Sequence, residues 1–218
     1  MGSFDTFWAQ GDLITRGVAV LMLAMSVSAW VMIFWKAWLL RRVQHDIARA
    51  VPAFWAAPSL DSGREQLAAF DREAVLAPML AAALAAPAGG TLEAQGHADS
   101  QLTRRLRDAL HGALAQLQFG QVLLASIGST APFIGLFGTV WGIYHALLGI
   151  SAAGTMTIER VSGPVGEALV MTAAGLAVAI PAVLAYNVFG KMAAASEAEL
   201  EGFAHDLREM LTDLARKA

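Results

Sequence analysis

The sequence predicts an all-α integral membrane protein with three transmembrane helices and long helical cytoplasmic extensions. Of its 218 residues, 56% are hydrophobic and 15% are charged, whereas about 25% of an average soluble domain is charged. No segment sustains the alternating pattern of a half-buried β-strand. Three long segments lack charged side chains, and each can cross about 30 Å of hydrocarbon as a helix. The charge-free segments are 17–35, 109–158 and 168–190, and we place the spans at residues 17–38, 122–150 and 163–190.

The first span is expected to be a permanent membrane anchor. Asp5 and Asp12 precede it with only Arg16 opposing them, whereas a signal peptide begins with a positive region. The apolar run also continues through Trp30 to Trp35.

Lysine and arginine predict the orientation. Nine of the 15 lie in residues 36–121 and four follow Tyr186, which leaves only Arg16 and Arg160 for the other side. The positive-inside rule therefore predicts a periplasmic N-terminus and a cytoplasmic C-terminus. The periplasmic segments are 1–16 and the short loop 151–162, and the cytoplasmic ones are the helical loop 39–121 and the C-terminal helix 191–218.

Both cytoplasmic segments are predicted to be helical. Pro78 is expected to end or kink a helix over 63–77, and Gly89-Gly90 to break the loop. A helix from Leu92 is expected to run straight into the second span. Apolar residues at three- and four-residue spacing make the C-terminal segment an amphipathic helix that packs on the cytoplasmic helices. They are Leu200, Phe203, Leu207, Met210, Leu211 and Leu214.

The sequence does not indicate an enzyme, and we expect no catalytic residue, metal site or cofactor. Its three lysines lie outside any glycine-rich loop, so a phosphate-binding P-loop is absent. Neither H-E-x-x-H nor G-x-S-x-G occurs, and there are no cysteines. The net charge of -3 and the lack of a sustained basic patch argue against a nucleic-acid partner.

Glycines recur every seven residues in the second span, at Gly128, Gly135, Gly142 and Gly149, and Gly138 shares their face. A seven-residue step drifts only about 20° around a helix, so these residues form one stripe. Such a stripe allows another helix to approach closely. The stripe is compatible with packing within one chain and with packing between subunits, and the sequence does not favour either.

Glu167 is the strongest single signal, because a charge in hydrocarbon costs at least about 2.5–3.5 kcal/mol. One interpretation pairs it at the interface with Arg160. The other makes it a carboxyl group that binds and releases protons. Pro164 suits a first helical turn, so we expect the helix to begin there, with Glu167 in that turn.

Three further polar residues lie in the spans. Thr139 and Thr172 either extend a polar path inward or bond only to their own helices. Glu167 and Thr172 are about 140° apart around a helix, so a path through both needs a wide lumen or a helix seam. His145 is expected to make an interhelical hydrogen bond rather than relay protons.

Two stretches resemble the ExbB/TolQ/MotA family of proton channels. Residues 131–143 (APFIGLFGTVWGI) look like the hallmark of its second helix, and 163–169 (GPVGEAL) with 179–183 (AIPAV) resemble its third. The resemblance is strong over 122–191 and covers the first span by position. It implies a homo-pentamer in the inner membrane of a Gram-negative bacterium, with membrane lipids around it and single-span helices of an ExbD-like partner in its lumen. The partner's transmembrane aspartate would face Glu167, Thr139 and Thr172.

Within the family, residues 163–172 are most similar to ExbB members. That similarity implies a TonB-like partner and energised uptake of iron-siderophores and vitamin B12 across the outer membrane. A TolQ-like role is the alternative, while MotA differs in having four spans. A non-conducting membrane scaffold would keep the helices and the glycine stripe without needing Glu167.

Overall fold

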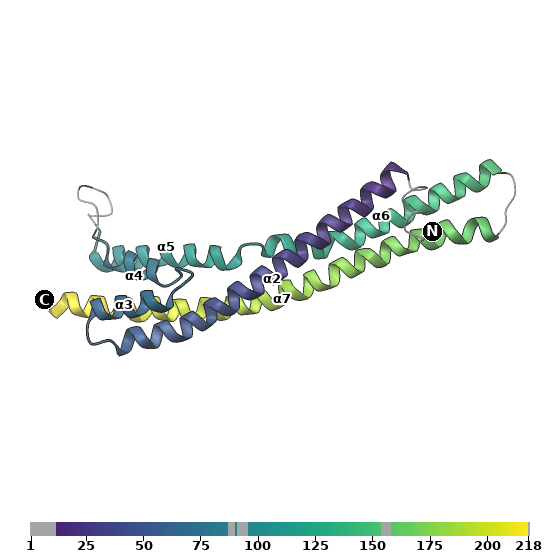
Figure 1. Cartoon of the computed structure of the whole chain (residues 1–218). Helices are drawn as coiled ribbons and strands as arrows, with labels where there is room; N and C mark the ends of the chain where they lie inside the picture. The colour runs from purple at the N-terminus through teal and green to yellow at the C-terminus, as the bar shows by residue number, and fades with distance from the viewer. Residues whose placement is uncertain (1–11, 87–89, 91–95, 154–157, 218) are drawn as a thin grey trace. The chain divides into compact units, whose positions relative to one another are not determined.

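The computed structural model describes residues 12–86, 90, 96–153 and 158–217, with the side chains of 152–161 left out. Every regular element in these residues is an α-helix, which confirms the predicted all-α fold (Figure 1). The helices are α2 (Leu13–Ala56), α3 (Leu60–Phe70), α4 (Ala77–Leu84), α5 (Ala98–Gln118), α6 (Gln121–Ala153) and α7 (Ile158–Lys217).

The chain forms two compact units. The first consists of Met1–Trp35 and Gly120–Val188, and the second of Lys36–Phe119 and Phe189–Ala218. The long helices α2 and α7 therefore contribute to both units.

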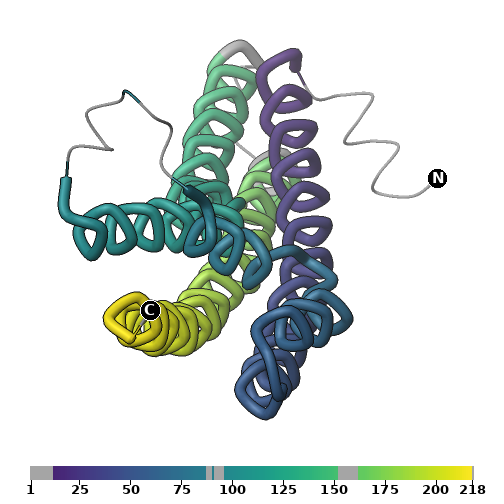
Figure 2. Tube along the Cα trace, turned by 90° about the vertical axis from the view of Figure 1, so that its left-hand side faces the viewer, coloured from purple at the N-terminus to yellow at the C-terminus, as the bar shows by residue number. Residues whose placement is uncertain are grey.

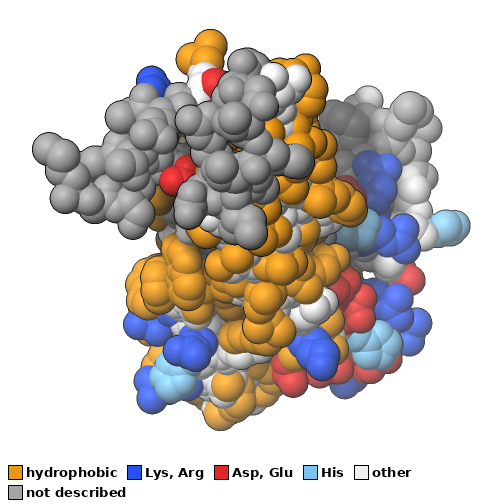
Figure 3. Space-filling model, turned by 90° about the vertical axis from the view of Figure 1, so that its right-hand side faces the viewer, with side chains coloured by type: hydrophobic (Ala, Val, Ile, Leu, Met, Phe, Trp, Pro, Cys, Tyr) orange, Lys and Arg blue, Asp and Glu red, His pale blue; other side chains and the backbone are white. Residues whose placement is uncertain are grey.

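Hydrophobic side chains cover much of the described surface on the face that Figure 3 shows. Phe34, Phe133 and Leu184 are each more than 60% exposed. Water disfavours such a surface, whereas lipid does not. In the described part of the chain, three helical stretches are long and apolar enough to cross a membrane, which confirms the predicted number. They are Leu13–Ala56, Ala98–Ser151 and Ser162–Lys217.

The helix α7 begins earlier than the sequence predicted. We expected its start at Pro164, but the helix starts at Ile158 and runs through both Pro164 and Pro181. Membrane helices tolerate proline because neighbouring helices and local adjustments satisfy the freed backbone groups. Glu167 consequently lies in the third turn instead of the first.

The helix expected to enter the second span without interruption is broken at Phe119 and Gly120. Gly120 has a φ of +78°, which favours glycine, and a Cβ there would overlap the sulfur of Met32. The fully buried Lys36 ammonium donates hydrogen bonds to the carbonyls of Leu117 and Phe119. These bonds satisfy carbonyl groups that the end of α5 leaves free. The expected helix start at Leu92 lies outside the described residues.

The single helix predicted over 63–77 is instead two helices. α3 ends at Phe70, and Asp71 then turns the chain into α4, where Pro78 occupies the first turn rather than ending a helix. Proline suits that position because the first turn has unpaired N–H groups in any case. The Asp71 carboxylate accepts backbone N–H groups at 2.6–2.9 Å from Val75, Leu76 and Ala77.

The C-terminal half of α7 packs through its apolar face. Leu200, Phe203 and Leu207 are buried, and the Phe203 ring meets Phe54 of α2 edge-on at 5.4 Å between centroids. This confirms the amphipathic prediction for these three residues. Leu214 departs from the prediction and is 53% exposed. It lies past the level at which α5 begins, since Thr212 already bonds to Asp99 in the first turn of α5.

Candidate functional site

The two predicted threonines meet between α6 and α7. Thr139 is 5% exposed and donates a hydrogen bond of 2.7 Å to the Leu136 carbonyl of its own helix. Thr172 donates across the helix pair to the Thr139 hydroxyl, with 3.4 Å between the oxygens. The pair is a short polar link between α6 and α7.

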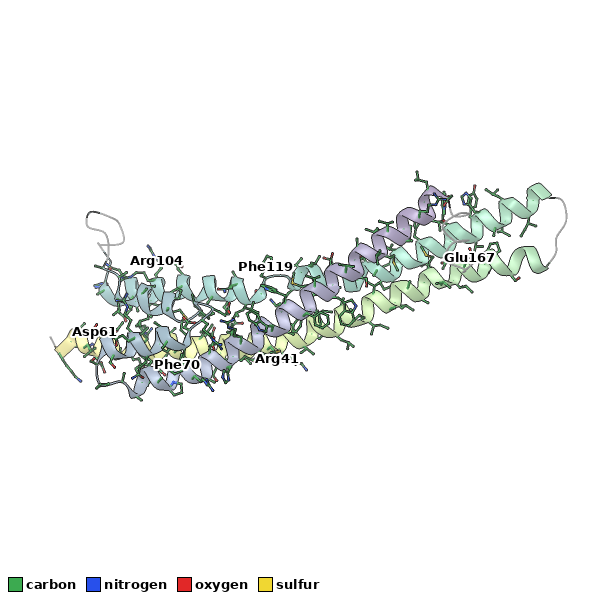
Figure 4. The ribbon with its side chains drawn as sticks, in the orientation of Figure 1. Arg41, Asp61, Phe70, Arg104, Phe119 and Glu167 are labelled. Carbon is green, nitrogen blue, oxygen red and sulfur yellow. The ribbon has the colours of Figure 1, made fainter. Side chains whose placement is uncertain are left out.

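Glu167 lies apart from this link. It is on α7 (Figure 4), its side chain is exposed, and within the described residues no hydrogen bond or ion pair joins it to another side chain. Its immediate exposed neighbours Leu169 and Val170 are apolar. The side chain of Arg160, the alternative partner, lies outside the described residues. The isolated chain thus presents a carboxylate on an apolar surface.

The glycine stripe is largely occupied by α7 of the same chain. A Cβ at Gly135 would lie 2.6 Å from the Met171 carbonyl oxygen and 3.2 Å from the Gly175 Cα, so the two backbones touch at this crossing. Gly149 has open space around it. Gly128, Gly138 and Gly142 face Val183, Met171 and Ala168 of α7 respectively.

A polar cluster that the sequence did not predict joins α2 to α6. The Asp12 carboxylate accepts the Thr15 backbone N–H at 2.8 Å, which caps α2, and the Trp141 indole N–H at 2.8 Å. His145 Nε2 lies 3.5 Å from the same carboxylate. His145 therefore lies beside the residue that caps α2, and the interhelical hydrogen bond expected for it stays a prediction. An aspartate directly before an apolar run is an N-cap signal, but it does not identify Trp141 as a partner.

The fold and these contacts define a multi-pass α-helical membrane protein. Residues 71–202 match the MotA/TolQ/ExbB proton channel family. The chain belongs to this family of proton-channel and transport subunits.

Individual relatives resemble the chain over most of its length. It is 39% identical to the biopolymer transport protein ExbB of Xanthomonas campestris, over 99% of this chain and 85% of that protein. Identity to ExbB of Neisseria meningitidis is 40%, over 92% and 93% of the two chains. The Tol-Pal system protein TolQ of Pseudomonas aeruginosa is 31% identical, over 83% and 80%.

Proposed function

We propose that this chain is the proton-channel subunit of a complex in the inner membrane of a Gram-negative bacterium. The complex uses the proton motive force to energise TonB-dependent uptake of iron-siderophores and vitamin B12. Similarity to two ExbB relatives over at least 92% of the chain supports this role. In this proposal the chain forms a homo-pentamer with its N-terminus in the periplasm, and an ExbD-like protein and a TonB-like protein complete the complex.

The exposed carboxylate of Glu167 is the observation that carries the proposal. A charge among exposed apolar side chains is costly against lipid, so another protein chain covers it in the assembled complex. A single-span ExbD-like helix with an aspartate fits this requirement. In this proposal the two facing carboxyl groups bind and release the transported proton.

The proposed path continues to the threonine link. Thr172 lies five residues beyond Glu167 on α7, about 7.5 Å further along the helix. Because the two side chains point to different sides of α7, the partner's carboxylate carries the proton between them in this proposal. The Thr172–Thr139 pair then provides hydroxyl oxygens between α6 and α7.

Replacing Glu167 with glutamine tests the proton channel. Glu167→Gln keeps the shape and removes the ionisable group, so proton-driven uptake and growth on scarce iron should fall to the level of a strain without the protein. Glu199→Gln is the matched control, because Glu199 is an exposed glutamate of α7 in the second unit, and it should retain activity. If the Glu167→Gln protein is stably expressed and its strain grows normally, the proton-channel proposal is contradicted. The non-conducting membrane scaffold then remains as the alternative.

A TolQ-like role in the Tol-Pal envelope system is the second candidate, since a TolQ relative aligns over 83% of the chain. Expression in a strain that lacks ExbB and in one that lacks TolQ separates the two roles. We expect restored siderophore uptake in the first strain and little restored envelope integrity in the second. The reverse pattern would assign the chain to the Tol-Pal system.

A further inference from the structure

The second unit contains a groove that the proposed proton path does not use. It lies between α5 and the C-terminal part of α7, which run side by side in opposite directions (Figures 1 and 2). Its volume is about 270 Å³. Leu106 and Leu110 of α5 supply apolar lining, while two arginines and two histidines contribute polar groups.

The two arginines of the groove, Arg107 and Arg208, differ from other arginines of the same unit. Arg42 is paired with Glu73 at 3.0 Å, and Arg72 makes a forked contact with a single carboxylate, that of Asp46. Within the described residues, no ion pair joins Arg107 or Arg208 to a carboxylate. The groove therefore holds two positive charges available to a ligand.

The register of the helices places these charges together. Thr212 bonds to Asp99 at 3.3 Å, so in this antiparallel pair Arg208 lies near the level of Thr103. Arg107 is one turn away, about 6 Å along α5. Glu201, a carboxylate in the groove lining, lies seven residues before Arg208, about 10 Å along α7. Glu201 is therefore near the level of Leu110, so Arg208 lies at one end of the groove, Glu201 at the other and Arg107 between them.

We propose that this groove binds a soluble, phosphate-bearing anion between Arg107 and Arg208, at the end away from Glu201. A guanidinium matches phosphate with two parallel N–H bonds, and the Thr103 hydroxyl in the lining adds a donor. His205 is turned toward Glu209, 3.3 Å away, and is less available.

A soluble ligand fits better than a lipid headgroup. Residues 201–208 follow Gly190, the end of the uncharged stretch, by 11 to 18 positions of the continuous helix α7. At 1.5 Å per residue they lie about 17–27 Å beyond it along the helix. The headgroup layer extends only roughly 5–8 Å beyond the hydrocarbon on each side.

Titration of the full-length protein with inorganic pyrophosphate, in nanodiscs of zwitterionic lipid, tests the site. We expect calorimetry to detect binding that weakens at least about tenfold in Arg107→Gln and in Arg208→Gln, since each loses a charge-assisted contact. Arg208→Lys, which keeps the charge without the fork, should fall in between. Arg64→Gln removes an exposed arginine of α3 that does not line the groove and should bind like the native protein.

The outcomes separate the alternatives. Absence of pyrophosphate binding to the native protein, or equal binding by the Arg107, Arg208 and Arg64 variants, overturns the proposal. A third outcome is that the two arginines bind phosphatidylglycerol supplied in the nanodiscs, while pyrophosphate does not bind. The ligand is then a lipid headgroup, and the proposal of a soluble anion is overturned. Glu167→Gln should bind pyrophosphate normally, so failure of the proton channel and failure of this site are distinguishable.

Discussion

The helices inside the first unit and those inside the second are stabilised by different kinds of packing. In the first, backbones touch at Gly135 and Gly175, and large apolar side chains lie outside. In the second, large side chains such as Leu200 and Phe203 fill the interior. Water drives large apolar groups inward, whereas lipid provides no such drive and leaves close approach of small residues to hold helices together. The surrounding solvent explains the difference.

Charged groups follow the same division. The second unit pairs Arg72 with Asp46, and the hydrogen bond from the guanidinium to that carboxylate raises the pKa of Arg72. Between α6 and α7 of the first unit, the polar link is the uncharged Thr172–Thr139 pair. Full charges need water or a counter-charge nearby, while hydroxyl groups are less costly to bury.

The largest expected effect comes from opening the interior of the second unit. Phe203→Ala removes a ring that is 2% exposed and contacts Phe54 and Trp55, so it should cost about 3–5 kcal/mol of local stability. Hydrogen exchange of peptides around residues 54 and 203 measures that loss. Leu214→Ala, on the same helix but exposed, should stay within about 0.5 kcal/mol. Equal exchange in both variants would contradict the assigned interior.

The second prediction concerns the first unit and has a smaller expected effect. Here adding an atom, rather than removing a side chain, should lower the stability of the unit. Gly135→Ala puts a Cβ 2.6 Å from the Met171 carbonyl oxygen, so α6 and α7 must separate at a cost of about 1–3 kcal/mol. Thermal unfolding in mild detergent, followed by circular dichroism, measures this cost. Gly149→Ala meets nothing within 4 Å and should be neutral or slightly stabilising. If both variants unfold alike, close backbone approach is not what holds this unit.

The sequence predicted the first unit better than the second. Gaps between charges located all three apolar helices, because a charge in hydrocarbon is costly and a span has a minimum length. For the second unit the prediction was wrong in detail, at α3 and α4 and at the break before α6. The break before α6 involves a contact between distant residues, Lys36 with the Leu117 carbonyl, and the turn at Asp71 depends on the geometry of its carboxylate with three backbone N–H groups. Local patterns do not encode such contacts.

The candidate site was predictable in its residue types and only partly in its geometry. Helical periodicity placed Glu167 and Thr172 on different sides of α7, and an uninterrupted helix through both preserves that spacing. That Thr172 meets Thr139 depends on how α6 and α7 cross at Gly135. A single sequence does not give the register of two helices.

The smallest expected effect concerns Asp12, the charged residue that links α2 to α6 in the first unit. The Thr15 backbone N–H, and then the Trp141 indole, lower the pKa of its carboxyl from 3.8 to about 2. A pKa lowered by folding stabilises the folded state above the unfolded value, and that contribution disappears as the pH falls from about 4 to about 2. Asp12→Asn keeps one oxygen to cap α2 but loses the acceptor of the Trp141 N–H, so it should cost about 1 kcal/mol at pH 7.

The pH dependence separates the charge of Asp12 from its capping role. Between pH 4 and pH 2, Asp12→Asn should lose less thermal stability in detergent than the native protein. The difference should be modest because the Asp12 side chain is 33% exposed and water screens its contacts. Identical pH profiles for the two proteins would mean that the cluster holds α2 on α6 through hydrogen bonds alone. The first unit would then resemble its threonine link throughout, with neutral polar contacts and no contribution from charge.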